Sequence, residues 1–210
     1  MVSFSLFEQD AIKEIFNMGI GRAADSLSRM IQEEVLLSVP HIEMVDRQQA
    51  IHIIQGRSAS HVAAIRQNFR GTFNGVSMLI YPESNSLELV RTLLGEDMPL
   101  ESLTELEQES LLEVGNVILN ACLGTFANMF ATELDFDLPE YVKGSCQDLL
   151  SLPAVNGSMV PPLQQLVFLI VDFITGAHTP QRNTIKGFVI LLLDMSTIAH
   201  LQDELGKLGG

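Results

Sequence analysis

A short pattern of polar residues occurs twice in this chain of 210 residues. In each copy a Glu is followed after two residues by an Asn, and a Pro follows that Asn after 22 intervening residues. The copies consist of Glu14, Asn17 and Pro40, and of Glu113, Asn116 and Pro139. Each residue of the second copy lies 99 positions after its counterpart. So long a conserved spacing indicates an internal duplication, which restricts the fold to two similar halves.

The polar residues of the first copy share one face of a predicted helix over residues 4–31. At about 100° per residue, Asp10, Glu14, Asn17 and Gly21 lie within roughly 60° of one another. The apolar residues form a separate stripe about 150° away and are Ile12, Phe16, Ile20, Ala23, Leu27 and Met30. We therefore expect the Glu and the Asn to face solvent.

The second copy repeats this arrangement on a predicted helix over residues 105–132. Its polar face carries Glu109, Glu113, Asn116 and Asn120. Exposed Glu and Asn residues are common on helices, and one copy alone would need no other explanation. An Asn inside a helix costs about 0.5 kcal/mol relative to Ala. Two such residues at matched positions indicate that the side chain has a function.

These motifs resemble the signature of the CheC/CheX/FliY family of chemotaxis response-regulator phosphatases. The signature is Asp or Ser, three residues, Glu, two residues, Asn, 22 residues and Pro. Asp10 completes it in the first copy, whereas the second copy has Glu109 at that position. Two motifs in a chain of this length are most similar to the CheC-like members of the family.

The resemblance implies a phosphatase acting on the aspartyl phosphate of a phosphorylated CheY-like receiver. Asn17 and Asn116 would lie beside the phosphoryl group and orient the attacking water, because an amide offers both a donor and an acceptor. The receiver would supply Mg²⁺ and a lysine, so that the chain needs no cofactor or metal of its own.

The resemblance also assigns roles to the carboxylates. Glu14 and Glu113 would meet the receiver's lysine and fix the docked position. Asp10 and Glu109 would support the interface. Catalysis by positioning needs no nucleophile in this chain, in agreement with the lack of any serine or cysteine hydrolase pattern.

The composition limits the partners. A net charge of −14 argues against nucleic-acid backbones and anionic membrane surfaces. The two cysteines, Cys122 and Cys146, form no CxxC, and the five histidines show no metal-ligand spacing. Residues 1–20 do not read as a signal peptide, and the apolar run at 166–174 is too short to cross a bilayer. We expect a cytoplasmic protein without membrane insertion.

The remaining elements follow from shorter patterns. Predicted strands are residues 35–45, with Pro40 at an edge or bulge, 61–70, 73–81, 136–142 around Pro139, 164–174 and 184–194. Predicted helices are 83–94, capped by Gly95, and a closing helix ending at Leu205 before Gly206. Residues 46–60 are predicted as a turn region and 96–104 as a linker. Residues 153–162 are an insertion in the second half, either a surface loop or a partner contact.

Together these elements predict an α+β fold with pseudo-two-fold related halves. The halves, about 1–97 and 104–210, would form one CheC-like domain over 1–210 with a shared, mostly antiparallel sheet. The two long helices would lie together on one side of it.

Three other interpretations remain open. The chain could be a non-catalytic flagellar-switch module of the same fold, or a regulator that binds the receptor deamidase CheD. It could also be a structural duplication whose Glu and Asn residues have no function. Retention of both Asn residues favours catalysis, because a scaffold needs no amide that positions water.

Overall fold

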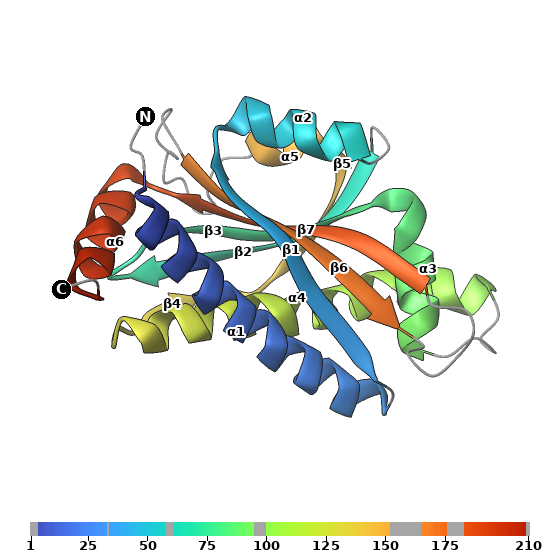
Figure 1. Ribbon diagram of the computed structural model, residues 1–210. Coiled ribbons are helices and arrows are strands. Elements are labelled where there is room, and N and C mark those ends of the chain that lie inside the picture. Colours follow the sequence, from blue (N-terminus) through green and yellow to red (C-terminus); the bar gives the residue numbers. More distant parts are fainter. Residues whose placement is uncertain are drawn as a thin grey trace.

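Two long helices cover one side of a strongly twisted antiparallel sheet (Figure 1). The computed structural model describes residues 4–32, 34–57, 61–94, 100–151, 165–175 and 183–208. The helices are α1 (Leu6–Ile31), α2 (Arg47–Arg57), α3 (Glu83–Leu94), α4 (Leu100–Met129), α5 (Cys146–Ser151) and α6 (Met195–Leu208). The strands are β1 (Val35–Val45), β2 (His61–Gly71), β3 (Gly75–Pro82), β4 (Leu134–Phe136), β5 (Glu140–Ser145), β6 (Gln165–Thr175) and β7 (Asn183–Leu193). The predicted α+β class is confirmed.

The sheet interleaves strands from the two parts of the chain. Its order is β1-β6-β7-β3-β2-β4, with β5 also paired to β2, and every pairing is antiparallel. With β5 as the last strand, the order is β1-β6-β7-β3-β2-β5. Exchanging β1 with β5, β2 with β6 and β3 with β7 gives the same order read from the opposite end. The two central strands, β3 and β7, come from different halves. Their pairing joins the two parts of the sheet.

The sheet buries both of its faces. One face packs against α1, α3, α4 and α6, where the core includes Phe16, Val90, Leu119 and Leu201. The opposite face packs against the two short helices α2 and α5 through residues such as Ile54 and Leu149. Figure 1 shows α1 and α4 on one side of the sheet and α2 and α5 on the other. The predicted placement of both long helices on one side is therefore correct.

A capping box fixes the start of α1. Ser5 Oγ accepts a hydrogen bond from the backbone nitrogen of Glu8, and Glu8 Oε2 accepts one from the backbone nitrogen of Ser5. These bonds satisfy two backbone donors that the first helical turn leaves open. At the other end Gln32 adopts a left-handed conformation, with φ of 58°. The predicted helix over 4–31 thus agrees closely with the structure.

The two long helices cross in opposite directions at a point where one of them has no side chain. A Cβ atom at Gly19 would lie 2.8 Å from Cα of Cys122 in α4. Nearby, Arg22 Nη1 donates to Thr125 Oγ1 at 3.2 Å. Similarly, a Cβ at Gly115 would lie 2.6 Å from Cβ of Ile65 in β2. These two glycines allow α4 to approach both α1 and the sheet closely.

α4 is also the most apolar long helix among the described residues. By length and composition alone its Leu106–Met129 segment could cross a membrane, and half of its most apolar stretch is buried inside the molecule. That burial, against α1 and the sheet, accounts for its apolar character as a core helix.

Several strand predictions are confirmed. Strand β1 matches residues 35–45 and lies at one end of the strand order, and its register with β6 shifts between Ser38 and His41, around Pro40. The predicted hairpin turns at Gly71, whose φ is 144° and whose Cβ would collide with the carbonyl oxygen of Glu133. β6 and β7 agree with the predicted strands within one residue at each end.

The turn predicted over residues 46–60 is wrong, because α2 occupies most of it. Asp46 Oδ1 accepts from the backbone nitrogen of Gln49, and Gln49 Oε1 accepts from the backbone nitrogen of Asp46. This capping box starts a helix whose fully buried residues, among those described, are Ala50 and Ile54. Because these two buried residues lie in a polar segment, the sequence shows little of the hydrophobic periodicity that predicts a helix.

Several elements of the second half also differ from the predictions. Pro139 interrupts the strand expected at 136–142, which becomes β4 and β5, each paired to β2, and α5 follows without having been predicted. α4 begins at Leu100, inside the predicted linker. α6 continues past Gly206 to Leu208. The predicted cap at Gly95 and the insertion at 153–162 lie outside the described residues.

Candidate functional site

The first motif occupies the outer face of α1. Asp10, Glu14 and Asn17 are all exposed, while the neighbouring Ile15 and Phe16 are buried in the core. Glu14 and Asn17 are three residues apart, which places their side chains side by side, about one helical turn apart. Gly21, one turn after Asn17, is exposed, and a Cβ there would have no heavy atom within 4 Å. The first site is therefore an open surface.

The second motif lies on α4 and is more enclosed. Glu109 and Glu113 are exposed, whereas Asn116 is half-buried. Asn116 Oδ1 accepts a hydrogen bond of 2.7 Å from Nδ2 of Asn120, one turn further along. Asn120 is the counterpart of Gly21, so the two copies differ in the surroundings of their asparagines. The prediction that both motifs are exposed is correct for the first copy and for the carboxylates of the second.

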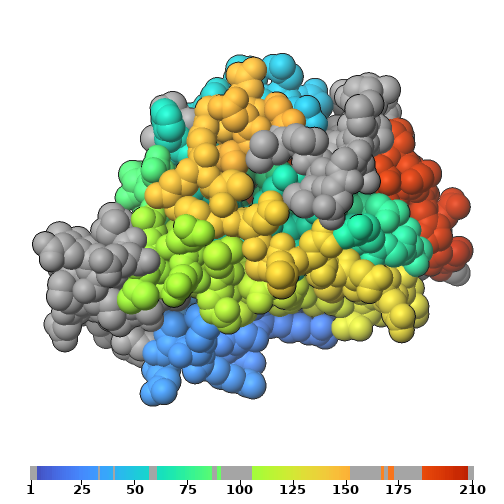
Figure 2. All heavy atoms as spheres, turned by 180° about the vertical axis from the view of Figure 1, so that it is seen from behind, coloured from blue at the N-terminus to red at the C-terminus, as the bar shows by residue number. Residues whose placement is uncertain are grey.

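The fold places both motifs on the same side of the sheet but on separate helices. Each motif belongs to one helix, and the helices are held together at the contact of Gly19 with Cys122. In Figure 2, which shows the molecule from behind, the outer surface of α4 (lime) runs above a blue N-terminal part of the chain. Gly19 at this contact thus determines how closely the two motif-bearing helices approach each other.

The chemistry available at the two motifs is limited to carboxylates and amides. Among the described residues no group of three or more His, Cys, Asp or Glu side chains could hold a metal ion. Burial raises the pKa of the Cys122 thiol to about 12, so this cysteine stays protonated and is a poor nucleophile. An Asn paired with a Glu can orient a water and a cationic partner, and the reacting group must come from another molecule.

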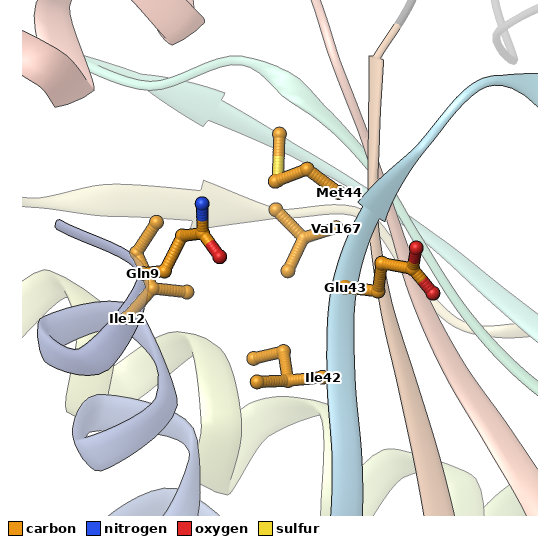
Figure 3. Close-up of a pocket in the computed structure, with 6 residues that line it drawn as sticks. All are labelled: Gln9, Ile12, Ile42, Glu43, Met44 and Val167. Atoms are coloured by element: carbon orange, nitrogen blue, oxygen red, sulfur yellow. The ribbon is translucent and has the colours of Figure 1, made fainter. Parts of the chain in front are cut away.

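A small hollow lies between α1 and the sheet (Figure 3). It is lined by Gln9, Ile12, Ile42, Glu43, Met44 and Val167 and has a volume of about 20 Å³. That volume holds about one water molecule. Gln9 Nε2 donates a hydrogen bond of 2.8 Å to the carbonyl oxygen of Phe4. The hollow is too small for a substrate.

One contact at the motifs was not predicted from the sequence. The helical spacing places Asn120 on the same face as Asn116, but it does not reveal the hydrogen bond between them. Two Asn residues four positions apart on a helix are the signal that suggests such a bond, because their side chains are neighbours.

Two sequence comparisons agree with the motif. A model of the CheC-like family matches residues 7–44, the segment that holds the first Glu, Asn and Pro. The flagellar motor switch phosphatase FliY of Bacillus subtilis is 24% identical over 137 residues, which are 64% of this chain and 35% of that protein. CheC1 of Halobacterium salinarum, whose name proposes it as a CheY-P phosphatase, is 18% identical over 177 residues, 82% of this chain and 83% of that protein. The chain thus spans about a third of the FliY relative.

Solved structures show the same fold. FliY of Thermotoga maritima superposes with a TM-score of 0.70 at 14% identity, covering 98% of this chain and 99% of that one. FliM in a FliM–SpeE complex from H. pylori superposes with a TM-score of 0.64 at 11% identity, covering 98% and 97%. At these identities the likeness concerns the fold alone. The matched motif segment and the two relatives thus support the resemblance to the CheC/CheX/FliY family, and the solved structures show that the fold is shared.

Proposed function

We propose that this chain is a phosphatase that hydrolyses the aspartyl phosphate of a phosphorylated CheY-like receiver in chemotaxis. The observation that carries the proposal is an exposed Glu on each of two neighbouring helices, followed after two residues by an Asn that is exposed on α1 and half-buried on α4. The apolar residues on the inner faces of these helices account for their packing. Packing therefore does not explain why a Glu and an Asn lie on each outer face. The names of the FliY and CheC1 relatives point to the same reaction.

The asparagines orient the attacking water in this proposal. The Asn17 amide is exposed and can reach into the active site of a docked receiver. Its oxygen accepts a hydrogen bond from the water, and its nitrogen donates to an oxygen near the phosphoryl group. Asn116 acts in the same way at the second site. Holding the water in line with the breaking P–O bond lowers the entropic part of the barrier.

The glutamates hold the receiver. Glu14 and Glu113 are exposed one turn before each Asn and are free to approach a lysine of the receiver. A charge pair there fixes the position of the amide relative to the phosphate. Asp10 and Glu109 lie one turn earlier and support the same interface. The Mg²⁺ for the reaction belongs to the receiver, and we place the reaction in the cytoplasm.

A second candidate is a non-catalytic module. The FliM structure has the same fold, and fold alone does not determine function. A chain of this kind would bind a receiver, a flagellar-switch protein or CheD without speeding phosphate loss. The two candidates differ in a single measurable property, which is the lifetime of the receiver phosphate.

The test compares the decay of a phosphorylated CheY-like receiver with the unaltered chain and with the double variant Asn17→Ala, Asn116→Ala. The unaltered chain should accelerate the decay. The double variant should lose nearly all of this acceleration, yet bind the phosphorylated receiver with similar affinity. Each single variant should retain about half of the acceleration if the sites contribute equally.

The controls keep the outcomes separate. Asn128→Ala removes another exposed Asn from α4, outside the motif, and should leave the decay unaltered. Full activity of the double variant would refute the water-positioning role. A chain that binds the phosphorylated receiver without accelerating its decay would favour the non-catalytic module.

A further inference from the structure

The two motifs are equivalent in sequence but differ in how their asparagines are held. Asn116 Oδ1 accepts from Asn120 Nδ2 at 2.7 Å, whereas the position equivalent to Asn120 in the first copy is Gly21. A glycine offers no side-chain donor. Of the two sites, the second therefore has a side-chain donor four residues after its Asn, and the first does not.

We propose that Asn120 is a positioning residue of the second site, which holds the Asn116 amide in one orientation before a receiver docks. The proposal rests on the phosphatase function proposed above and concerns a residue outside the Glu-x-x-Asn motif. It predicts two unequal sites, one with its amide held in place on α4 and one with a freely turning amide on α1.

The hydrogen bond restrains a torsion that is otherwise loose. The terminal torsion of an Asn side chain has broad, nearly two-fold preferences, so an unrestrained amide presents its oxygen or its nitrogen in turn. An amide oxygen has two lone pairs. Asn120 occupies one of them, and the second remains available for a water. Asn116 thus keeps the capacity that the reaction needs and loses the freedom to turn.

The surroundings of Asn120 indicate that its Nδ2 donor, rather than its packing, explains an Asn at this position. Asn120 Oδ1 is buried and has no hydrogen-bond partner among the described residues. An unsatisfied buried oxygen is unfavourable, and Ala is a better helix former than Asn. Packing alone would therefore favour a small apolar residue at this position. The bond from Nδ2 to Asn116 is the contact that explains an Asn here.

The test isolates the second site by placing every variant in the Asn17→Ala chain. Asn120→Ala and the nearly isosteric Asn120→Leu should each lower the saturating decay rate of a ³²P-labelled receiver about five-fold. This is the effect expected from losing one hydrogen bond that contributes about 1 kcal/mol. The chain concentration that gives half of the maximal rate should stay within about two-fold of its value for the Asn17→Ala chain, because receiver binding depends on the carboxylates.

A second readout follows the amide itself. The ¹³Cγ chemical shift of Asn116 reports on the hydrogen bond to its oxygen, and in Asn120→Leu it should move toward that of Asn17 in the unaltered chain. Asn128→Ala on the same helix should alter neither the shift nor the rate. In a chain that carries Asn116→Ala, replacing Asn120 should have no further effect on the rate.

Three outcomes in the Asn120 variants would overturn the proposal. They are an unchanged saturating rate in both Asn120 variants, a change confined to the half-maximal concentration, and a loss of rate that persists without Asn116. If the Asn17→Ala chain itself fails to accelerate decay while the unaltered chain does, the second site is inactive and the proposal falls. If the unaltered chain also fails, the proposed function falls with it.

Discussion

At the scale of single residues, the carboxylates and the amides of the motifs have separable roles. Glu14 and Glu113 are exposed, and neither is part of the buried core. Replacing them should therefore leave the fold intact and change only what the helices bind. Their contribution depends on the partner, because an exposed carboxylate gains little from a cation until docking excludes water.

The double variant Glu14→Ala, Glu113→Ala should bind the phosphorylated receiver more weakly. Charge pairs that an interface desolvates are worth about 2–5 kcal/mol, so the dissociation constant should rise at least tenfold. The decay rate at saturating concentration should fall less than the affinity. Titration of a labelled receiver alongside its phosphate decay separates the two quantities.

A charge-matched control for this variant is Glu43→Ala, Asp203→Ala. It removes two exposed carboxylates from β1 and α6, away from the motif faces. Binding close to that of the unaltered chain is expected. Equal weakening by the control and by the motif variant would mean that net charge, rather than a specific pair, attracts the receiver.

At the scale of secondary-structure elements, the position of both sites depends on how closely α1 approaches α4. A Cβ at Gly19 would lie 2.8 Å from the Cα and 3.4 Å from the backbone nitrogen of Cys122. Backbone atoms cannot rotate away as a side chain can. The helices would have to separate, which would also disturb the buried Phe16 and Phe126 rings, whose centroids are 6.3 Å apart.

Gly19→Ala should therefore destabilise the protein. Overpacking typically costs about 1–3 kcal/mol, which exceeds the gain of up to about 1 kcal/mol that Ala brings to a helix. Gly21→Ala is the matched control, since its Cβ would meet no heavy atom within 4 Å, and it should be neutral or stabilising. Urea denaturation of the three proteins measures both effects. A Gly19→Ala protein as stable as the Gly21→Ala protein would contradict the close contact.

The elements also show what a sequence can and cannot predict. The long helices were predictable because their wide apolar stripes repeat over seven or more turns, and the motif faces follow from the same periodicity. α2 was missed because its buried stripe is only Ala50 and Ile54. The Asn116–Asn120 bond and the fit of Gly19 against Cys122 depend on atomic distances and side-chain orientation, which no periodicity specifies.

At the scale of the whole molecule, neither half can complete its part of the sheet alone. β1 pairs with β6, β2 pairs with β4 and β5, and the central pair β3–β7 joins the halves. The core under the sheet is shared in the same way, because α1 packs against α4. We therefore expect the two halves of the chain to fold as one unit, although each carries its own motif.

We predict that residues 1–97 and 104–210, produced separately, do not fold. In the first fragment β1 would lose β6, its only partner among the described strands, and β3 would expose the edge that pairs with β7. Both fragments would also expose the apolar faces of their long helices, which favours aggregation. Circular dichroism during heating should show a cooperative transition for the full chain and none for either fragment. Mixing the fragments during refolding should restore the transition, because all pairings of the sheet can then form between them. A cooperative transition of one fragment by itself would show instead that each half is an independent domain.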